Sequence, residues 1–488
     1  MGADQRRVLL LHVPVTGGAE DGGIHESAAV REIHEETGLT IPLEELRHLV
    51  EREEVDTVLL AITDMQGRLQ GKRCHGGYFL EQVVANAAEA CNYLLAVDVD
   101  MHTVGGYAMS SWERGYGDFV MRPDLTTLRL VPWHPATALC VADLEWTDST
   151  PVVASPRQIL RRQVDRLAER GWTALGATEL EFIVFKDSYE EAWAKAYRDL
   201  TPANLYNVDY SLLGTARVEP LLRRIRNEMA GAGLHPESAK GECNLGQHEI
   251  AFRYADVLTT ADGHSIYKTG AKEIAAQEGM SLTFMAKFDE REGNSCHIHI
   301  SVRDGQGQPV FTSDDGGKPV GVFGQFMAGL LATLREMTLL FAPNINSYKR
   351  YTEGSFAPTA VAWGRDNRTC SLRVIGHGES LRVENRVPGG DVNPYLALAA
   401  LVAGGLHGID QGLTLEPECT GNAYAASDRP RVPGTLAEAR ALFEHSEVAR
   451  SAFGDEVVDH YAHMATVELA AFESSVTDWE RFRGFERL

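Results

Sequence analysis

Three short stretches of this chain place ionisable side chains on every second residue. They run from Glu179 to Phe182, from His297 to Ser301 and from Arg382 to Arg386. Because successive side chains of a β-strand point to opposite faces, each stretch would gather its ionisable side chains on one face of a strand. The residues between them would pack into a core: Leu180, Phe182, Ile298, Ile300 and Val383. The pattern predicts a sheet with one wall of carboxylates, imidazoles and guanidiniums.

A simpler interpretation of such alternation is the solvent-exposed (wet) face of an ordinary antiparallel sheet. Wet faces, however, are rich in Thr, Ser, Lys and Gln, whereas these three stretches contain almost only metal ligands and anion binders. Their presence in one chain favours metal-assisted phosphoryl chemistry over a solvent-facing surface.

Composition limits the class of protein. At 488 residues the chain is long enough for two domains. A net charge of −23 argues against nucleic acid as a partner and gives no support for an anionic membrane surface. No apolar run is long enough to cross a bilayer. The seven cysteines include no Cys-x-x-Cys pair, which favours a reduced, cytoplasmic setting without structural zinc.

The order of expected elements predicts an α+β protein in three parts: an N-terminal extension at 1–43, a small domain at 44–147 and a large domain at 148–488. In the small domain we expect a hairpin of strands at 58–64 and 69–73, a helix at 79–90, and strands at 94–99 and 126–131. Ser155-Pro156 is a helix-start signal that opens the large domain. Further helices are expected at 220–231, 256–279, 322–340 and 393–404.

The N-terminal extension contains a second, weaker pattern. Residues 24–39 resemble a fragment of a Nudix box, closely so from Arg31 to Leu39. Gly23, however, stands where the box has its first glutamate, and too few residues surround the fragment to build the sheet that such a site needs. We therefore expect a surface helix or a leader here.

Two further segments contain candidate ligands. The segment from Glu237 to Glu249 holds three glutamates and two glycines, so it cannot be a regular helix. It is either a solvated acidic loop or a chain reversal that offers two carboxylates to Mg²⁺ or Mn²⁺. The basic pair Lys349-Arg350 precedes a glycine-containing loop, and Arg368 and Arg373 follow, as an anion site with a mobile cover would require.

Taken in order, these motifs resemble the glutamine synthetase family, type I-like, from about Leu46 to the C-terminus. The shared motifs are Glu-x-Glu, Gly-Gln-x-Glu, His-x-His-x-Ser, Asn-Ser-Tyr-Lys-Arg, Arg-x-Glu-x-Arg and Asn-Pro-Tyr. The resemblance implies a β-grasp-like N-terminal domain and a catalytic domain with a curved antiparallel sheet and surrounding helices. It also implies a dodecamer of two stacked hexamers, with active sites between neighbouring subunits.

The resemblance also implies ATP as co-substrate and two or more Mg²⁺ or Mn²⁺ ions in each site. The implied ligands of one ion are Glu181, Glu242 and Glu249, and those of the second are Glu179, His297 and Glu384. The implied nucleotide contacts are Glu237, His299, Ser301 and Arg373. The implied glutamate contacts are Gly293, His297, Arg350 and Arg386. The implied catalytic arginines, which hold substrate or the transferred phosphoryl group, are Arg350, Arg373 and Arg382.

The chain departs from the family where ammonium would bind. Ala108 or a neighbour stands where the family has an aspartate, and Phe356 stands at the position of a glutamate on a flap. A desolvated ammonium ion needs such negative charges. We therefore expect an organic amine as acceptor, in apolar contact with Phe356, Tyr107 and Met109. The product would be a γ-glutamyl amide, in amine catabolism or detoxification.

Several alternatives remain open from the sequence. A shifted alignment would give Glu353 the flap role and make the protein an ammonium-using glutamine synthetase. A polyamine acceptor would need a second acidic subsite, from Glu113, Asp118 or Glu353. A catalytically silent scaffold is a third possibility, which the complete set of metal ligands argues against. Polyamines, ethanolamine, alkylamines and anilines are all eligible acceptors.

Overall fold

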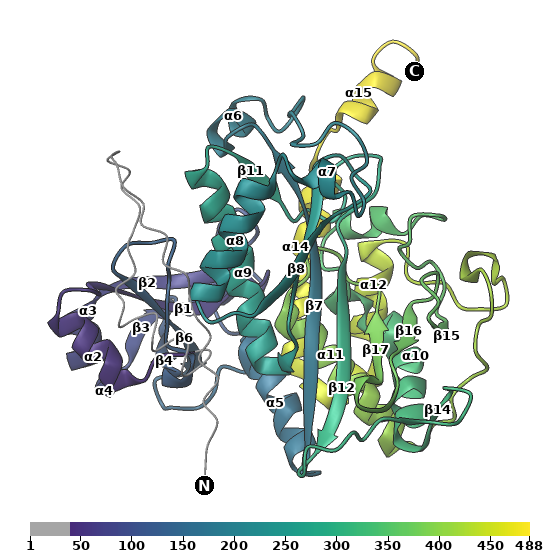
Figure 1. The fold of residues 1–488 in the computed structure, drawn as a ribbon, viewed down its shortest axis with the longest axis horizontal. Coiled ribbons are helices and arrows are strands. Elements are labelled where there is room, and N and C mark those ends of the chain that lie inside the picture. Colours follow the sequence, from purple (N-terminus) through teal and green to yellow (C-terminus); the bar gives the residue numbers. More distant parts are fainter. Residues whose placement is uncertain (1–39) are drawn as a thin grey trace, which may run out of the picture.

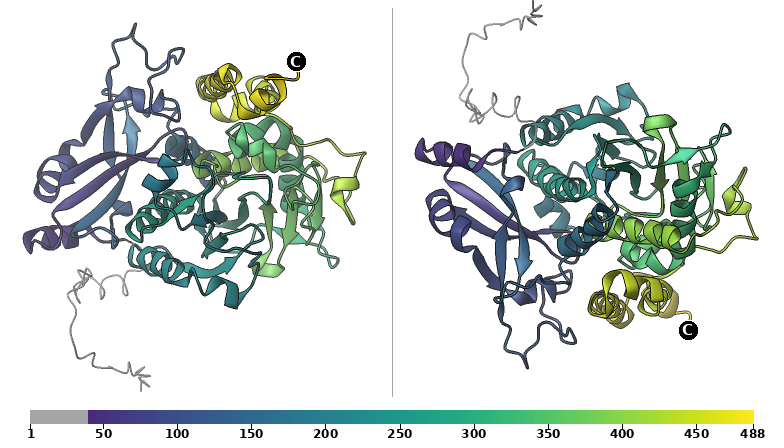
Figure 2. Two further views of the ribbon diagram at one scale, coloured as in Figure 1. Left: turned by 90° about the horizontal axis from the view of Figure 1, so that it is seen from above. Right: turned by 90° about the horizontal axis from the view of Figure 1, so that it is seen from below.

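The computed structural model describes residues 40–488. The Nudix-like fragment and nearly all of the expected N-terminal extension lie outside these residues. Within them the chain forms two sheets that stand side by side, with helices packed mainly around the second (Figures 1 and 2). This is the expected α+β class. The division at residues 147 and 148 stays a prediction.

The first sheet has the strand order β2-β1-β6-β4-β3, with β5 paired to β6. The strands are β1 (Thr57–Thr63), β2 (Leu69–His75), β3 (Ala88–Cys91), β4 (Asp118–Pro123), β5 (Arg129–Leu130) and β6 (Thr137–Glu145). Strands β1 and β6 are parallel and the other pairs are antiparallel. The predicted hairpin is confirmed, because Thr63 pairs with Leu69 across the turn.

Two expectations for this region are wrong. The predicted strand at 94–99 is a short 3-10 helix, Asn92–Leu95, followed by irregular chain. A short apolar run does not by itself distinguish a strand from a helical turn. The predicted helix at 79–90 ends at Asn86, because Ala87 has a φ of 62° and β3 follows at once. Helical structure here comprises α2 (Leu43–Glu51), α3 (Gly76–Tyr78), a π-helix (Phe79–Val83), α4 (Val84–Asn86) and a 3-10 turn (Leu125–Thr127).

The second sheet has the order β15-β16-β17-β12-β7-β9-β8, with β10 and β11 paired to β7. Its strands are β7 (Trp172–Phe185), β8 (Pro236–Gly241), β9 (Gln247–Phe252), β10 (Ala255–Asp256), β11 (Ser281–Thr283), β12 (Cys296–Asp304), β15 (Trp363–Arg365), β16 (Leu372–Ile375) and β17 (Arg382–Asn385). A separate pair is formed by β13 (Thr312–Ser313) and β14 (Pro319–Val320). The apolar residues of the alternating stretches are at most 1% exposed, as the alternation predicted: Leu180, Phe182, Ile298, Ile300 and Val383.

Helices cover the apolar face of β7 and leave the other face to the ionisable side chains (Figure 1). The five helices predicted for the large domain are present as α5 (Pro156–Ala168), α8 (Glu219–Gly231), α9 (Val257–Gln277), α10 (Gly321–Phe341) and α11 (Pro394–Asp410). The others are α6 (Tyr189–Ala194), α7 (Leu212–Thr215), α12 (Leu436–Glu444), α13 (Glu447–Phe453), α14 (Asp455–Ser474) and α15 (Asp478–Gly484). Short 3-10 turns lie at Asn346–Arg350, Gly378–Ser380 and Ala423–Ala425. Among residues 40–488, no helix has both the length and the hydropathy of a membrane span.

A buried ion-pair network joins the first sheet to the helices of the second. Arg157 on α5 is 2% exposed and binds Asp262 of α9 through Nε and Nη2, at 3.0 and 2.9 Å. Its Nη1 and Nη2 also reach Asp143 and Asp124 of the first-sheet region, at 2.7 and 2.8 Å. Breaking such a buried pair leaves an uncompensated charge, so this network fixes how the two halves meet.

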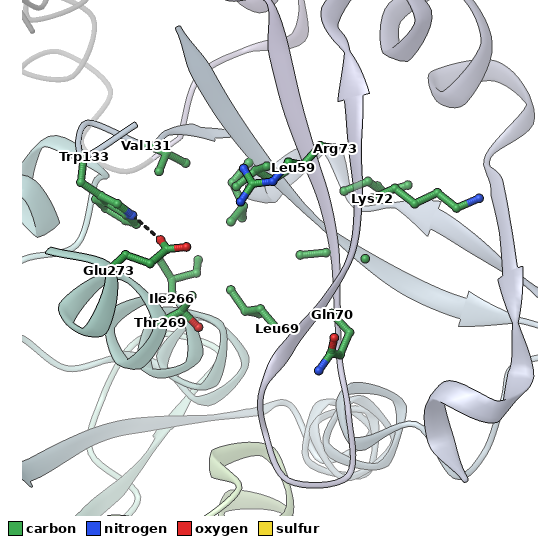
Figure 3. Close-up of a pocket in the computed structure, with 14 residues that line it drawn as sticks. Leu59, Leu69, Gln70, Lys72, Arg73, Val131, Trp133, Ile266, Thr269 and Glu273 are labelled. Carbon is green, nitrogen blue, oxygen red and sulfur yellow. Dashed lines mark hydrogen bonds between the residues drawn. The ribbon is translucent and has the colours of Figure 1, made fainter. Parts of the chain in front are cut away.

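A groove follows the same seam (Figure 3). Leu59 and Leu69 of the hairpin face Ile266 of α9 across it. Trp133 donates from Nε1 to Glu273 Oε2 of α9 at 2.7 Å, so the polar groups at this end of the groove satisfy each other.

The buried histidine His460 on α14 is expected to make the fold acid-sensitive. Burial lowers its pKa to about 3. Because the folded state disfavours the protonated ring, stability is retained above the unfolded pKa of about 6.5 and falls below it, by about 1.4 kcal/mol per pH unit. Chemical denaturation between pH 7 and 5 should therefore show a smaller pH slope for His460→Gln than for the native protein. The exposed His102 provides the control, since His102→Gln should leave the slope unchanged.

Candidate functional site

The candidate site is a row of ionisable side chains set by strand register across the second sheet. On β7 and β9, Glu181 stands opposite Glu249, and Lys240 of β8 continues this line. On β7 and β12, Glu179 stands opposite His297. A third line joins His299 of β12, Glu384 of β17 and Arg373 of β16. Directly opposed side chains lie about 5 Å apart at Cβ, so the register alone brings these groups within reach of shared ligands.

The first carboxylate group comprises Glu181, Glu242 and Glu249, whose ligand oxygens lie within 4.8 Å of one another. The segment 237–249 is not a loop but the hairpin of β8 and β9, and this reversal presents Glu242 beside Glu249. Glu181 Oε2 accepts hydrogen bonds from Gln247 Nε2 at 3.0 Å and from the Ser295 amide at 2.7 Å. Burial, with the neighbouring carboxylates, raises the pKa of Glu249 to about 8, despite the nearby Lys240. This concentration of buried negative charge calls for a cation.

The second group lies one strand away, where Glu179, His299 and Glu384 have ligand atoms within 4.8 Å of one another. His299 Nε2 lies 2.9 Å from Glu179 Oε1. His297 Nδ1 lies 3.4 Å from Glu179 and 3.6 Å from Glu384. Although burial opposes it, hydrogen bonding to His297 and His299 holds the pKa of Glu179 well below its usual value, so Glu179 is ionised at neutral pH.

Two arginines converge on Glu384, which is 1% exposed. Arg373 Nη1 donates to Glu384 Oε2 at 3.0 Å, and Arg386 Nη1 donates to Oε1 at 2.5 Å. Glu384 is therefore held in one orientation, and both guanidiniums are held beside the carboxylate groups. Such fixed guanidiniums suit forked binding of a carboxylate or a phosphate.

One cavity of about 710 Å³ gathers most of the predicted residues on its wall. Those present are Glu179, Glu181, Glu242, Glu249, Gly293, His297, Phe356, Arg373, Glu384 and Arg386. At Gly293 an added Cβ would lie 2.3 Å from the Ala286 carbonyl oxygen and 2.7 Å from Arg350 Cγ, so this close approach needs glycine.

A second cavity, of about 430 Å³, gathers three of the four expected nucleotide contacts and the expected catalytic Arg382, whereas the fourth, Arg373, lines the first cavity. It is lined by Glu237, His299, Ser301 and Arg382, and it shares Glu179 with the first cavity. Arg382 Nε lies 3.2 Å from His299 Nδ1. The two cavities meet at Glu179.

The structure does not bring every expected residue to these walls. Arg350 is 2% exposed and lies beneath the first cavity, where it donates to the Val387 carbonyl and to Ser295 Oγ, each at 2.9 Å. Tyr107 and Met109 are buried within the chain, with Tyr107 packed against His460 and His463, each at 4.6 Å between ring centroids. Because both side chains are buried in the core of the chain, neither reaches the cavity to make the contact with an amine that was expected of it.

Sequence reasoning overlooked Lys240 as a site residue. Its ammonium group pairs with Glu242 and lies 3.8 Å from Glu249 Oε1. It lies 5.0 Å from the Tyr210 ring centroid. The sequence contained a signal for Lys240, because Ser238, Lys240 and Glu242 occupy alternate positions, as the ionisable residues of the three stretches do. Arg368 also lines the cavity, and its place in an arginine-rich stretch was its only sequence signal.

These residues fit divalent metal ions. His297 is 8% exposed, and its Nε2 is buried without a hydrogen-bond partner anywhere in 40–488. An unpartnered buried imidazole nitrogen beside ionised carboxylates is suited to ligate a metal. Oxygen ligands with one imidazole suit Mg²⁺ or Mn²⁺ better than a thiolate-preferring ion.

Comparisons with known proteins agree with this geometry. The family described as glutamine synthetase, catalytic domain, matches residues 153–483. The chain is 66% identical over 446 residues to the gamma-glutamylethanolamide synthetase of Streptomyces coelicolor, which covers 91% of this chain and 96% of that protein. It is 38% identical over 443 residues to the glutamate–isopropylamine ligase of a Pseudomonas species, with 90% and 96% coverage. A solved GmaS–ADP complex has a TM-score of 0.80 at 26% identity, covering 90% of this chain and 99% of that chain. The chain therefore belongs to the glutamine synthetase family, as the order of its motifs predicted.

Proposed function

We propose that this protein joins the γ-carboxylate of glutamate to an organic amine at the expense of ATP, through γ-glutamyl phosphate. The observation that supports this most directly is the first cavity, in which carboxylates, guanidiniums and the Phe356 ring share one wall. Two relatives have names that state the same chemistry, a gamma-glutamylethanolamide synthetase and a glutamate–isopropylamine ligase.

The family is ATP-dependent and uses divalent metals. In this chain one ion would be held by Glu181, Glu242 and Glu249, and a second by Glu179, His297 and Glu384. Bound there, Mg²⁺ or Mn²⁺ would neutralise phosphate charge as the γ-phosphoryl group leaves ATP.

The protein's own groups bind and orient the substrates. Glu237, His299 and Ser301 would hold the nucleotide, and Arg382, on the same cavity wall, would act on the phosphoryl group that is transferred. Arg386 would position glutamate. Gly293 on the same wall and Arg350 beneath the cavity would assist it. Arg373 would hold the transferred phosphoryl group, since its guanidinium is fixed by Glu384. These fixed groups also exclude water from the acyl phosphate.

The reaction has two balanced steps. The γ-carboxylate oxygen attacks the γ-phosphorus of ATP, and ADP leaves. The amine, in its uncharged form, then attacks the acyl carbon, inorganic phosphate leaves as the amide bond forms, and the nitrogen loses one proton to phosphate or solvent. Without phosphorylation the carboxylate would offer no adequate leaving group.

Phe356 supports an organic acceptor over ammonium. Its side chain is 55% exposed and lines the cavity, whereas Glu353 lines a neighbouring pocket and lies 3.9 Å from Arg431. Glu353 thus does not take the place of the flap glutamate on this wall, and an alkyl group on the acceptor would gain apolar contact with the Phe356 ring.

Introducing Phe356→Glu is expected to raise kcat/KM for ammonium about fivefold, since an exposed ion pair contributes up to about 1 kcal/mol. The kcat/KM for ethanolamine should fall. Phe356→Gln separates the two effects, because it removes the ring without adding charge and should lower ethanolamine use alone. Steady-state phosphate release against each amine measures both constants. An unchanged kcat/KM for ammonium in Phe356→Glu would show that the acceptor amine does not bind at Phe356.

ATP-dependent phosphate release with glutamate and a panel of acceptors tests the proposal as a whole. The panel comprises ethanolamine, isopropylamine, putrescine, spermidine, aniline and ammonium, and mass spectrometry identifies the amide. Turnover with an organic amine is expected. Turnover with ammonium alone would make the protein a glutamine synthetase, and no turnover with any acceptor would favour a silent scaffold.

The proposal includes assembly into two stacked hexamers in the cytoplasm. Exposed apolar side chains support an assembly: Trp193, Leu212, Leu213, Trp479 and Phe482. All seven cysteines are free thiols, which is consistent with a reduced compartment. Light scattering should give a mass about twelve times the 53.6 kDa of one chain. A monomer at micromolar concentration would contradict this arrangement.

A further inference from the structure

A cavity of about 280 Å³ lies where the first sheet meets α9. It adjoins the second cavity described above, with which it shares Ala177, Thr178, Phe252 and Tyr254. Its wall is built by Arg129 of β5, Thr178 of β7, Leu234 after α8, Phe252 of β9 and His264 of α9. Thr178 lies between Ala177 and Glu179 on β7, so its side chain faces the helices, whereas Glu179 faces the metal ligands. The part of the cavity at Thr178 is thus on the opposite face of the strand, while Ala177 borders both this cavity and the second one.

Arg129 is the unusual member of this wall. It is 4% exposed, and its only side-chain hydrogen bond within residues 40–488 runs from Nε to the Thr127 carbonyl, at 3.1 Å. The nearest charge network does not supply an acceptor, because both oxygens of Asp262 are bound by Arg157, and Oδ1 also accepts from the Tyr395 hydroxyl at 2.6 Å. A guanidinium has five N–H groups, and leaving most of them without acceptors in a buried place is unfavourable.

His264 presents a second unpartnered group. The ring is 4% exposed, its Nδ1 lies 3.1 Å from Thr178 Oγ1, and its Nε2 has no partner among the described residues. Burial lowers the pKa of His264 well below its usual value, so the ring is neutral at pH 7. If the Thr178 hydroxyl donates to Nδ1, the ring proton is on Nε2 and is available to an acceptor. The Tyr267 hydroxyl, also on this wall, is buried without a partner too.

The groove of Figure 3 also lies against α9, but its polar groups differ from those of the Arg129 cavity. There the polar groups pair with each other, as Trp133 does with Glu273, and no donor is left over at that contact. In the Arg129 cavity every unpartnered group can donate, and one is a fixed positive charge. The rest of the wall combines apolar and aromatic residues, among them Leu234, Phe252 and Tyr254, with the polar residues His235, Arg253, Thr259 and Thr260.

We propose that this cavity binds a small organic anion, with its oxyanion between Arg129 and His264 and its apolar body against Leu234 and Phe252. A carboxylate or a phosphate offers the same chemistry, namely paired oxygens for a forked guanidinium bond. The size of the cavity restricts the ligand to a small metabolite, since drug-sized ligands occupy about 300–1,000 Å³.

Calorimetric titration of the full-length protein tests the site with three probes: benzoate, acetate and inorganic phosphate. Saturable binding of at least one is expected, and comparison of the three separates a carboxylate ligand from a phosphate. Arg129→Gln should weaken this binding at least tenfold. Arg122→Gln, an arginine of the same sheet that pairs with Glu145 on the surface, should leave it unchanged.

Phosphate is also a product of the proposed reaction, so the active site needs its own control. Arg373→Gln should retain the binding assigned to the Arg129 cavity. Binding that is lost in Arg373→Gln but retained in Arg129→Gln would overturn the proposal. So would the absence of binding for all three probes.

Two further measurements keep the proposal testable if Arg129→Gln does not fold. His264→Gln changes the other end of the site and should weaken binding severalfold. Crystals of the native protein soaked in 4-bromobenzoate should show an anomalous bromine peak beside Leu234 and Phe252. Bromine found only elsewhere, together with unchanged binding in His264→Gln, would exclude the site.

Discussion

Replacing Glu181 with Gln is expected to lower amine-ligase activity about a thousandfold. A metal ion at a transferring phosphoryl group contributes several kcal/mol, and each 1.4 kcal/mol corresponds to about tenfold in rate. The amide oxygen of Gln can replace Oε2 as acceptor for Gln247 Nε2 and the Ser295 amide. Its NH₂ group would then face the ion and could not ligate it. Phosphate release with glutamate and ethanolamine measures the loss.

The same variant separates a catalytic effect from a structural one. Glu181→Gln removes one of three crowded carboxylates, so the metal-free protein should be at least as stable as the native chain. Glu290, an exposed carboxylate of the neighbouring pocket, provides the matched control, and Glu290→Gln should change activity by less than about threefold. Equal activity losses in both variants, or a large loss of stability in Glu181→Gln, would contradict the assigned role.

Removing divalent ions with a chelator is expected to abolish activity and to lower the thermal midpoint. Glu181 and Glu249 lie in one group of three carboxylates and are each 7% exposed, so their mutual repulsion is poorly screened by water. Two such charges 4 Å apart interact by about 4 kcal/mol at an effective dielectric constant of 20. An ion present at a hundred times its Kd would stabilise the fold by about 2.7 kcal/mol. Differential scanning calorimetry and the phosphate assay measure the two effects.

Readdition identifies the ion. Either Mg²⁺ or Mn²⁺ should restore both activity and the thermal midpoint, and Glu181→Gln should show a smaller thermal gain. Full activity in the chelated enzyme would exclude a metal from the reaction. Recovery of stability without recovery of activity would show that the ions are structural.

Much of the secondary structure follows from local pattern. Ser155-Pro156 marks the start of α5, and Gly171, at a φ of 70°, follows soon after its end. The alternation of Leu180 and Phe182 with the glutamates correctly indicated the buried and the polar face of β7. Local pattern failed at 94–99, where an apolar run is compatible with either a strand or a helical turn and only packing decides.

Residue types, together with the resemblance to the family's motifs, indicated the chemistry expected of the site. Carboxylates, imidazoles and guanidiniums on alternate positions, in the order of the family's motifs, indicated two metal ions and a phosphoryl transfer before any distance was known. Which residues meet was a different question. Glu181 stands opposite Glu249 and Arg373 opposite Glu384 because of strand register, and register depends on packing across the whole sheet.

The sequence by itself thus determined the family, the fold class and the ligand types, because these depend on side-chain chemistry and short-range periodicity. Only the tertiary structure decided that Lys240 joins the carboxylates, that Arg350 lies beneath the cavity and that Tyr107 is buried. It alone placed Arg129 and His264 on the wall of one cavity. Residues so far apart along the chain meet only when the core closes, and the free energy of that closure is shared by many weak contacts that no short motif records.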